Sequence, residues 1–319
     1  MILITGATGF IGSRLRQPHH RALVRTASGM PNEMVGDLSD LHLLERACAG
    51  ITTIIHCAGI ADANTRDTAA LWRINVEGTR NLLTAAARMG VRRFVLLSSV
   101  KAMADPGDSC ADESWPASPA TPYGQSKRAA EKIAQEIGER SGMEIVILRP
   151  CPVYGRGCRG PIALLARLID WHLFPPLPET DNRRSIVHIS DLIRAIELAA
   201  THPAAANHTF IIAHPYPPST RELTDAIRAT LGRTLPRWHL PHTLFTALRC
   251  APRSLSTFVE RLTASACYAS NKIESLLGWR ATIDLATGLS EMLGHTPPIH
   301  PKPNSNPHCH DSNPHHPHA

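Results

Sequence analysis

The first half of the chain alternates short apolar runs with longer stretches in which apolar residues recur every three or four positions. Short runs rich in β-branched residues are typical of buried strands, and the longer repeat is typical of helices with one buried face. The strand pattern occurs at residues 2–5, 21–24, 53–57, 94–97 and 145–148, and the helix pattern occurs at 40–49, 67–89 and 123–140. This alternation predicts an α/β fold with a doubly wound parallel sheet.

The pattern loosens beyond Pro150, where prolines become frequent and the elements become shorter. A strand-like run at 185–189 leads into a helical pattern from Asp191. We therefore expect two domains. The larger one comprises residues 1–157 with 185–213, and a smaller C-terminal α/β domain comprises 158–184 with 214–294.

Residues 295–319 differ from the rest of the chain in composition. They hold seven of the 18 histidines and seven of the 26 prolines, with very few apolar side chains. Such a segment cannot bury enough surface to fold, so we expect a disordered tail. Its histidines and Cys309 could bind a transition metal, but no fixed geometry is encoded and we predict no metal site.

The formal net charge is +6, and it belongs to residues 1–294 because the tail holds only Lys302 and Asp311 as charged residues. The basic residues are scattered, with few aromatic residues between them. This pattern argues against a nucleic-acid surface and favours a small anionic ligand.

The cysteines and the apolar runs bear on the compartment. The eight cysteines form no Cys-x-x-Cys pair and no regular framework, which favours reduced thiols in a cytoplasmic protein. Because the first strand pattern starts at Ile2, we expect no signal peptide. No run approaches the roughly 20 apolar residues of a membrane span, so we expect no membrane contact.

The first predicted strand runs directly into a glycine-rich loop, Gly6-Ala7-Thr8-Gly9-Phe10-Ile11-Gly12. In such a loop the first glycine permits a tight turn, the second lets backbone amides approach a pyrophosphate, and the third allows close packing of a helix on the strand. Because this triplet follows a strand, we predict that Gly6, Gly9, Phe10, Ile11 and Gly12 bind a dinucleotide.

The end of the second predicted strand bears on which dinucleotide binds. A carboxylate there usually takes the ribose 2′-hydroxyl of NAD. Here the strand ends in Arg25, whose guanidinium can pair with the 2′-phosphate of NADP, so the sequence favours NADP over NAD. Arg25 could instead be a solvated residue. Asp37 and Leu38 could hold the adenine edge, although Asp37 could equally be a turn residue or a helix N-cap.

A second constellation is Tyr123-Gly124-Gln125-Ser126-Lys127, at the start of a helical pattern. Tyr123 and Lys127 are four residues apart and share one helix face, where the ammonium can lower the pKa of the phenol. That pKa must fall from about 10 by roughly three units for proton exchange near neutrality. The strand at 94–97 delivers Ser98 and Ser99, where a hydroxyl can contact the same substrate oxygen.

With these motifs the chain resembles an extended short-chain dehydrogenase/reductase of the NAD-dependent epimerase/dehydratase family, which acts on nucleotide sugars. The resemblance covers nearly all of residues 1–294. It rests on TGATGFIG at Thr5, GDL at Gly36, HCAG at His56, NVEGT at Asn75, SSV at Ser98, YGQSK at Tyr123, RPCPVYG at Arg149 and RRSIVHISDL at Arg183. It implies a Rossmann-type sheet with a smaller nucleotide-sugar-binding domain.

The resemblance also implies residue roles. Tyr123 is the acid/base, Lys127 lowers its pKa and binds the nicotinamide ribose, and Ser99 orients the substrate oxygen. Asn75 supports the helix that carries them. Ala58, Gly59, Pro150 and Val153 line the cofactor. Arg184 matches an arginine that clamps the substrate diphosphate, but it could instead form a salt bridge. Lys101 could contact the sugar, or it could be a solvated loop residue.

Departures from the family pattern narrow the reaction. Arg25 lies only 13 positions after Gly12, and Pro18 lies between them, so the first crossover helix must be short. Val100 and Lys101 follow Ser99 where the dehydratases of the family carry an Asp-Glu pair, which disfavours dehydration. These residues resemble a UDP-glucose 4-epimerase-like subgroup that includes reductases of 4-keto UDP-sugars. Both reactions move a hydride at C4 of a UDP-hexose.

Two other functions remain open from the sequence. One is an NADP-dependent reductase of a hydroxysteroid or flavonoid-like ketone, in which Arg184 would be structural. The other is a catalytically silent regulatory protein that binds the cofactor. The resemblance further implies a possible homodimer through the helices near residues 67 and 123.

Overall fold

The computed structural model describes residues 1–62, 65, 67–179, 181–235, 239–241 and 264–294. The tail predicted at 295–319 lies outside the described residues, as do Cys250 and Cys309.

The central sheet has seven strands in the order β10-β7-β5-β4-β1-β2-β3, and every neighbouring pair is parallel. The strands are β1 (Ile2–Thr5), β2 (Arg21–Val24), β3 (Glu33–Val35), β4 (Thr53–His56), β5 (Arg93–Leu97), β7 (Glu144–Pro150) and β10 (Thr209–Ile212). The chain leaves β1 toward β2 and β3 on one side and then returns to β4 on the other. The predicted α/β doubly wound fold is confirmed, and its switch point lies between β1 and β4.

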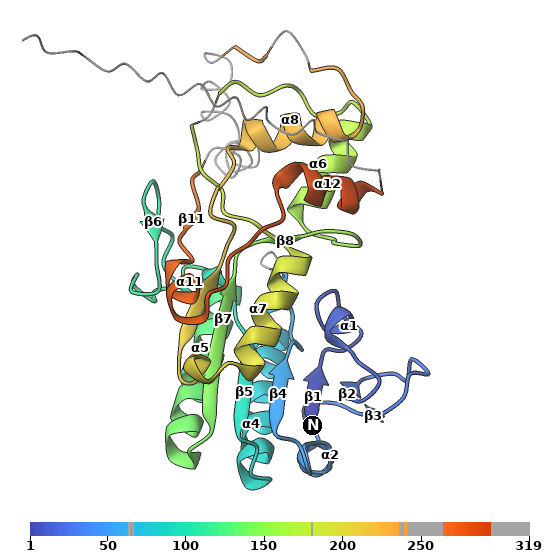
Figure 1. The fold of residues 1–319 in the computed structure, drawn as a ribbon, viewed down its shortest axis with the longest axis vertical. Helices are drawn as coiled ribbons and strands as arrows, with labels where there is room; N and C mark the ends of the chain where they lie inside the picture. Colours follow the sequence, from blue (N-terminus) through green and yellow to red (C-terminus); the bar gives the residue numbers. More distant parts are fainter. Residues whose placement is uncertain (63–64, 66, 180, 236–238, 242–263, 295–319) are drawn as a thin grey trace, which may run out of the picture.

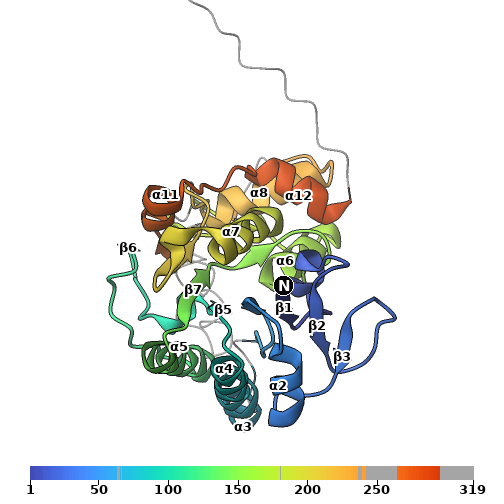
Figure 2. The same ribbon diagram turned by 60° about the horizontal axis from the view of Figure 1, so that its bottom comes forward.

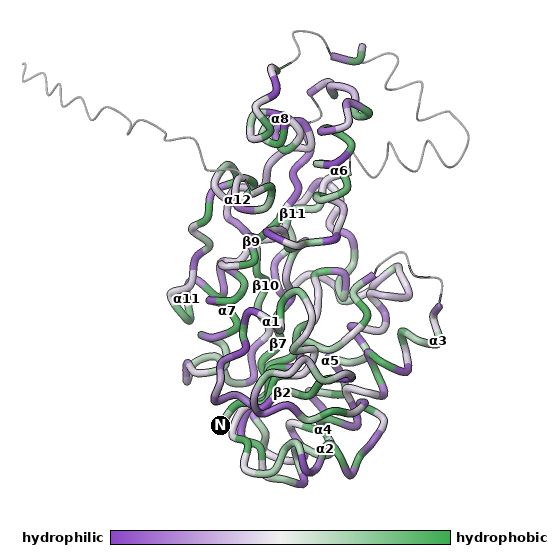
Figure 3. Tube along the Cα trace, turned by 90° about the vertical axis from the view of Figure 1, so that its right-hand side faces the viewer, coloured by the Kyte–Doolittle hydropathy of each residue, from purple (hydrophilic) through white to green (hydrophobic). Residues whose placement is uncertain are grey.

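Helices cover both faces of this sheet (Figure 2). One face packs against α2 (Leu41–Cys48), α4 (Gly78–Arg88) and α5 (Pro122–Ser141), through a cluster that includes Leu44, Leu83 and Ile133. The other face packs against α7 (Ile189–Thr201) and α11 (Asn271–Leu277). Because both faces are buried, the strands are apolar along most of their length, as the hydropathy colouring shows (Figure 3).

Two predicted segments differ in detail from the observed elements. The helical pattern at 67–89 divides into α3 (Thr68–Leu71), a π-helix (Trp72–Glu77) and α4. The strand pattern at 185–189 yields only β9 (Val187–His188), because α7 already begins at Ile189. The His188 side chain accepts a hydrogen bond from the Ser190 N–H and so caps that helix. The first crossover helix, α1 (Gly12–Leu15), is as short as the spacing requires.

A second group of elements lies beyond the carboxyl ends of the strands (Figure 1). It contains α6 (Pro161–Asp170), α8 (Thr220–Thr230) and α12 (Leu285–Leu293), which share a core around Ile169, Ile227 and Leu289. A short 3-10 turn (Pro203–Ala205) precedes β10, and β8 (Val153–Tyr154) pairs with β9. The fully buried Asp191 accepts the backbone N–H groups of Thr282 and Ile283, and so fastens this second group to α7.

The prediction that the cysteines are reduced thiols is wrong for one pair. β6 (Cys110–Ala111) and β11 (Cys267–Tyr268) pair in parallel, and this register places Cys110 opposite Cys267 in a disulfide. The two residues are 157 positions apart in sequence, so no local spacing could reveal them. Cys48, Cys57, Cys151 and Cys158 are free thiols.

No helix in the described part of the chain is long and apolar enough to cross a bilayer.

The disulfide gives a test of stability. Replacing Cys110 by Ser should lower the free energy of unfolding of the oxidised protein by about 3 kcal/mol, because the cross-link closes a long loop in the unfolded chain. Urea unfolding with and without a reductant measures this difference. Cys158→Ser, at a free thiol, serves as the control. Equal stabilities of Cys110→Ser and wild type under oxidising conditions would contradict the pairing.

Candidate active site

The predicted glycine loop lies at the carboxyl end of β1, where it contacts the loop after β4. Gly6 has φ +66°, and a Cβ added to it would lie 2.7 Å from the backbone N of Ala58. A Cβ on Gly12 would lie 2.3 Å from the Gly6 carbonyl oxygen. Neither position can carry a side chain. The loop therefore presents bare backbone at the switch point, as binding of a dinucleotide pyrophosphate requires.

The other residues predicted around the cofactor gather at this edge of the sheet. Phe10, Ile11 and Val153 are partly buried and pack against the same apolar cluster. Pro150 ends β7, two strands from β4 across β5. Arg14 donates hydrogen bonds to the carbonyls of Phe10 and Arg156, and thereby fastens the glycine loop to the chain that follows β8.

The residues predicted to hold the adenine end of the cofactor follow β2 and β3. Asp37 Oδ1 accepts hydrogen bonds from the Ser39 backbone N–H at 3.0 Å and from Ser39 Oγ at 2.8 Å. These bonds lower the pKa of Asp37, and the charges of Arg25 and Arg73 lower it further. Arg25 is exposed. Arg73, which the sequence did not single out, thus acts on Asp37 together with Arg25. Leu38 packs against Gly78.

The predicted catalytic residues meet at the start of α5. Thr121 caps this helix by accepting the Gly124 N–H, and Pro122 occupies its first turn. The Tyr123 side chain is 8% exposed, and the Ser99 hydroxyl lies close enough to it to lower its pKa. Lys127 lies one turn further on the same face, and its Nζ donates to the Leu97 carbonyl at 2.9 Å. The structure therefore brings Ser99, Tyr123 and Lys127 together.

Gly124 makes this arrangement possible, although the sequence analysis gave it no role. A Cβ there would lie 2.1 Å from the Lys101 carbonyl oxygen. The missing side chain lets α5 pack directly on the 3-10 turn Val100–Ala102, whose N-cap is Ser99. The glycine directly after Tyr123 in the Tyr-x-x-x-Lys motif is the sequence feature that could have indicated this close contact.

Burial dominates the ionisation of the two central groups. It raises the pKa of Tyr123, and the nearby Ser99 hydroxyl opposes this rise. Burial also lowers the pKa of Lys127 to about 8, although the nearby Cys57 and Glu131 favour its charged form. The Lys127 ammonium contacts a carbonyl rather than the phenol, so its predicted effect on the pKa of Tyr123 stays a prediction.

Asn75 connects the loop after β4 to the catalytic helix. Its Oδ1 accepts the Ile60 N–H at 2.8 Å, and its Nδ2 donates to the Ile60 carbonyl and to Ser126 Oγ, each at 3.1 Å. A Cβ on Gly59 would lie 2.9 Å from Asn75 Oδ1, so this loop too must be bare. Asn75 belongs to the π-helix, a form that is frequent at functional sites.

A buried ionic cluster, which the sequence did not single out, anchors α5 to the sheet. Glu131 is fully buried, and its carboxylate accepts a hydrogen bond from Ser98 Oγ at 2.5 Å. It also accepts two bonds from Arg149, at 2.9 and 2.7 Å, and one from Arg128 at 2.9 Å. Glu131 follows Lys127 by one helical turn, a spacing that could have signalled its inward position. The cluster joins β5, α5 and β7.

Two cationic side chains lie beyond Tyr123, toward the second group of elements. Lys101 Nζ lies 3.5 Å from Asp105 Oδ1, and an Arg184 NH group donates to the Ala264 carbonyl at 2.9 Å. Burial lowers the pKa of Arg184, while the charge of Asp105 and then Tyr268 oppose this. Asp105 therefore acts on both Lys101 and Arg184, and an anionic group placed here would meet two cations.

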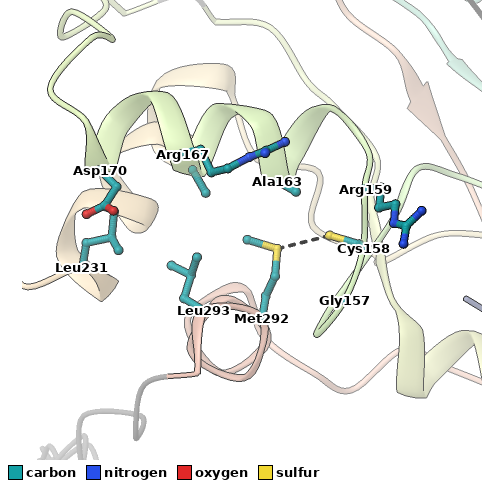
Figure 4. Close-up of a pocket in the computed structure, with 10 residues that line it drawn as sticks. Gly157, Cys158, Arg159, Ala163, Arg167, Asp170, Leu231, Met292 and Leu293 are labelled. Carbon is teal, nitrogen blue, oxygen red and sulfur yellow. Dashed lines mark hydrogen bonds between the residues drawn. The ribbon is translucent and has the colours of Figure 1, made fainter.

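A separate pocket of about 530 Å³ lies between α6 and α12. Figure 4 shows that Cys158, Arg159, Arg167, Asp170 and Met292 line it. No residue predicted for catalysis, cofactor binding or substrate binding lines this pocket.

The ionic cluster predicts a loss of stability on neutralisation. Glu131→Gln should lower the free energy of unfolding by about 3 kcal/mol, because it leaves the buried Arg149 guanidinium without its counter-charge. Chemical denaturation followed by circular dichroism measures the change. Glu136→Gln, on the exposed face of the same helix, is the matched control. Equal losses in the two variants would contradict the assignment.

Comparison with known proteins places the chain in a family. The family model for the NAD dependent epimerase/dehydratase family matches residues 2–213. A UDP-glucose 4-epimerase of Vibrio cholerae is 31% identical over 315 residues, covering 91% of this chain and 93% of that protein. An N-acetyl-α-D-glucosaminyl-diphospho-ditrans,octacis-undecaprenol 4-epimerase of Escherichia coli O157:H7 is 27% identical over 252 residues, covering 76% of each. The solved structure of MoeE5 in complex with UDP-glucose and NAD has a TM-score of 0.73 and 26% identity, covering 92% of this chain and 97% of that one. The chain is a member of the NAD-dependent epimerase/dehydratase family of extended short-chain dehydrogenase/reductase enzymes.

Proposed function

We propose that this enzyme catalyses oxidoreduction at C4 of a UDP-hexose, with 4-epimerisation as its reaction. The observation that carries the proposal is that the Tyr123 phenol lies near the Ser99 hydroxyl and one helical turn from Lys127, at the carboxyl end of β5. Similarity to the UDP-glucose 4-epimerase of Vibrio cholerae over nearly the whole chain supports this reaction.

The chemistry follows from these three side chains. A bound nicotinamide would accept the C4 hydride and return it. Tyr123 would remove the proton of the 4-hydroxyl and restore it to the 4-keto oxygen, while the Ser99 hydroxyl holds that oxygen in place. The charged Lys127 would favour the ionised phenol and bind the nicotinamide ribose. Its burial behind Tyr123 keeps water from competing for these contacts.

The substrate class is inferred from the charge beyond Tyr123. Lys101 and Arg184 lie around Asp105, where a diphosphate would replace that carboxylate as their counter-ion. The structural neighbour MoeE5 was solved with UDP-glucose. Val100 and Lys101 form a 3-10 turn directly after Ser99, in place of the acidic pair of the dehydratases, so elimination of water is not proposed.

A second candidate reaction is reduction of a 4-keto UDP-sugar with NADPH. Arg25 at the end of β2 favours it, because this exposed guanidinium, with Arg73 near Asp37, could bind a 2′-phosphate. NADP is therefore slightly favoured over NAD, although MoeE5 was solved with NAD.

The two reactions are separated by a pair of assays. Incubation with UDP-galactose and catalytic NAD should produce UDP-glucose if the enzyme is an epimerase. Incubation with a 4-keto UDP-sugar and NADPH should consume NADPH stoichiometrically if it is a reductase. Tyr123→Phe should lower kcat by at least about 100-fold in the active assay, since it removes the proton-transferring hydroxyl. Unchanged activity in that variant would overturn the catalytic assignment.

The pKa of Lys127 predicts the alkaline limb of the pH profile. A pKa lowered to about 8 means that Lys127 is charged below pH 8 and neutral above it. Because kcat/KM reports ionisations of the free enzyme, it should fall above an apparent pKa near 8. Lys127→Arg, which keeps its charge, should lose this limb, and Lys132→Met on the exposed face of α5 should retain it. A wild-type profile that stays flat to pH 10 would contradict this prediction.

A further inference from the structure

His56 is buried at the end of β4, and both of its ring nitrogens are hydrogen-bonded. Its Nδ1 lies 2.6 Å from Thr5 Oγ1, and its Nε2 lies 3.0 Å from Thr79 Oγ1. Thr5 directly precedes the glycine loop, and Thr79 belongs to α4. The residue is 1% exposed. None of the roles assigned above uses this histidine.

The neighbouring bonds determine which nitrogen carries the proton. Thr79 Oγ1 donates its only hydrogen to the Asn75 carbonyl at 2.7 Å, so it must accept from His56 Nε2–H. His56 Nδ1 is then the acceptor, and Thr5 donates to it. Thr5 Oγ1 in turn accepts the Ala58 N–H at 3.3 Å. The bonds thus run in one direction, from Ala58 through Thr5, His56 and Thr79 to Asn75.

The chain of bonds continues through Asn75 into the catalytic helix. Asn75 Nδ2 donates to Ser126 Oγ, and Ser126 donates to the Tyr123 carbonyl at 2.8 Å. The path therefore crosses from β1 and β4 to α4 and α5 (Figure 1). It starts at the bare loops that fit the dinucleotide and ends at the backbone of the residue predicted to transfer the proton.

We propose that His56 is a positioning residue that fixes the catalytic helix relative to the cofactor-binding loops through this chain of hydrogen bonds. The inference rests on the proposed function for its kinetic test, because it assigns His56 a part in hydride transfer between cofactor and sugar. The chain requires a neutral ring. Burial, and then the charge of Lys127, lower the pKa of His56 to about 3, so the ring is neutral near pH 7.

Loss of this chain of hydrogen bonds is expected to lower kcat rather than substrate affinity. Each residue of the hydrogen-bond chain holds a backbone segment or Asn75 in place. None of them belongs to the group of Lys101 and Arg184, where the diphosphate is proposed to bind. Loss of the chain would shift the distance and angle between cofactor and substrate. A displacement of about 1 Å can reduce the rate of such a reaction by about 100-fold.

The test compares four single variants and one double variant of the full-length protein. His56→Phe replaces the imidazole, whose centroid lies 5.6 Å from that of the Phe94 ring, by an aromatic ring without nitrogens. Thr79→Val removes only the hydroxyl with little change of shape. His56→Gln keeps a donor and an acceptor. Thr84→Val is the matched control, because Thr84 on the same helix bonds to the carbonyl four residues earlier at 2.8 Å but lies outside the chain.

We expect kcat to fall by about 10- to 100-fold in His56→Phe and in Thr79→Val, with KM for the UDP-sugar within about twofold of wild type. His56→Gln should recover most of the loss, and Thr84→Val should match wild type. The double variant His56→Phe/Thr79→Val should be no slower than the worse single variant, because both changes break one chain. An unaffected kcat in Thr79→Val, or fully additive losses in the double variant, would overturn the proposal.

A second measurement separates this proposal from the proposed function. If the wild-type enzyme converts neither UDP-galactose nor a 4-keto UDP-sugar, the proposed function fails. The chain of hydrogen bonds is then tested by unfolding experiments instead. The free energies of unfolding of the two single variants and the double variant should then also be non-additive. If His56→Phe does not fold, Thr79→Val with Ser126→Ala supplies the same cycle. Additive changes in the free energy of unfolding would show that these residues are not coupled through one chain of hydrogen bonds, whatever the substrate is.

Discussion

The site depends on keeping a lysine and a tyrosine inside the protein, side by side, on the first turns of one helix. A buried ammonium is costly unless fixed dipoles or charges replace its water. Here the Leu97 carbonyl accepts from Lys127, and the carboxylate of Glu131 lies one turn further along α5. The sheet supplies the first partner and the helix supplies the second. The position of α5 against β5 therefore controls both the charge of Lys127 and the setting of Tyr123.

Two sets of polar contacts hold that position from different sides. The Glu131 cluster joins α5 to β5 and β7 through ionic hydrogen bonds, while Asn75 and Ser126 join it to the loop after β4. Such contacts are directional, whereas apolar packing against the sheet would tolerate small shifts of the helix. Apolar burial holds α5 against the sheet, and these polar contacts fix its position along the sheet. The bare backbone at Gly6, Gly12, Gly59 and Gly124 completes the arrangement by allowing loops to touch.

The second group of elements brings charge rather than catalysis to the site. Arg184 precedes β9 and pairs as a single bridge with Ala266, so its place depends on chain segments far apart in sequence. Asp105 lies in the loop between β5 and α5, close to both Lys101 and Arg184. A substrate that links the two groups of elements would thus bind where cations from both converge. The Cys110–Cys267 disulfide joins the same two regions of chain.

The sequence by itself determined the βαβ order, the glycine loop and the Tyr-Lys helix, because local periodicity and spacing encode each of them. It also identified the short first crossover, since 13 positions cannot hold a full helix and two turns. Tertiary structure alone decided which distant groups meet. Glu131 meets Arg149, His56 meets Thr5 and Thr79, and Cys110 meets Cys267 only once strands and helices are stacked. These partners are separated by 18 to 157 positions, and no local pattern links them, because buried polar groups select partners by space rather than by sequence.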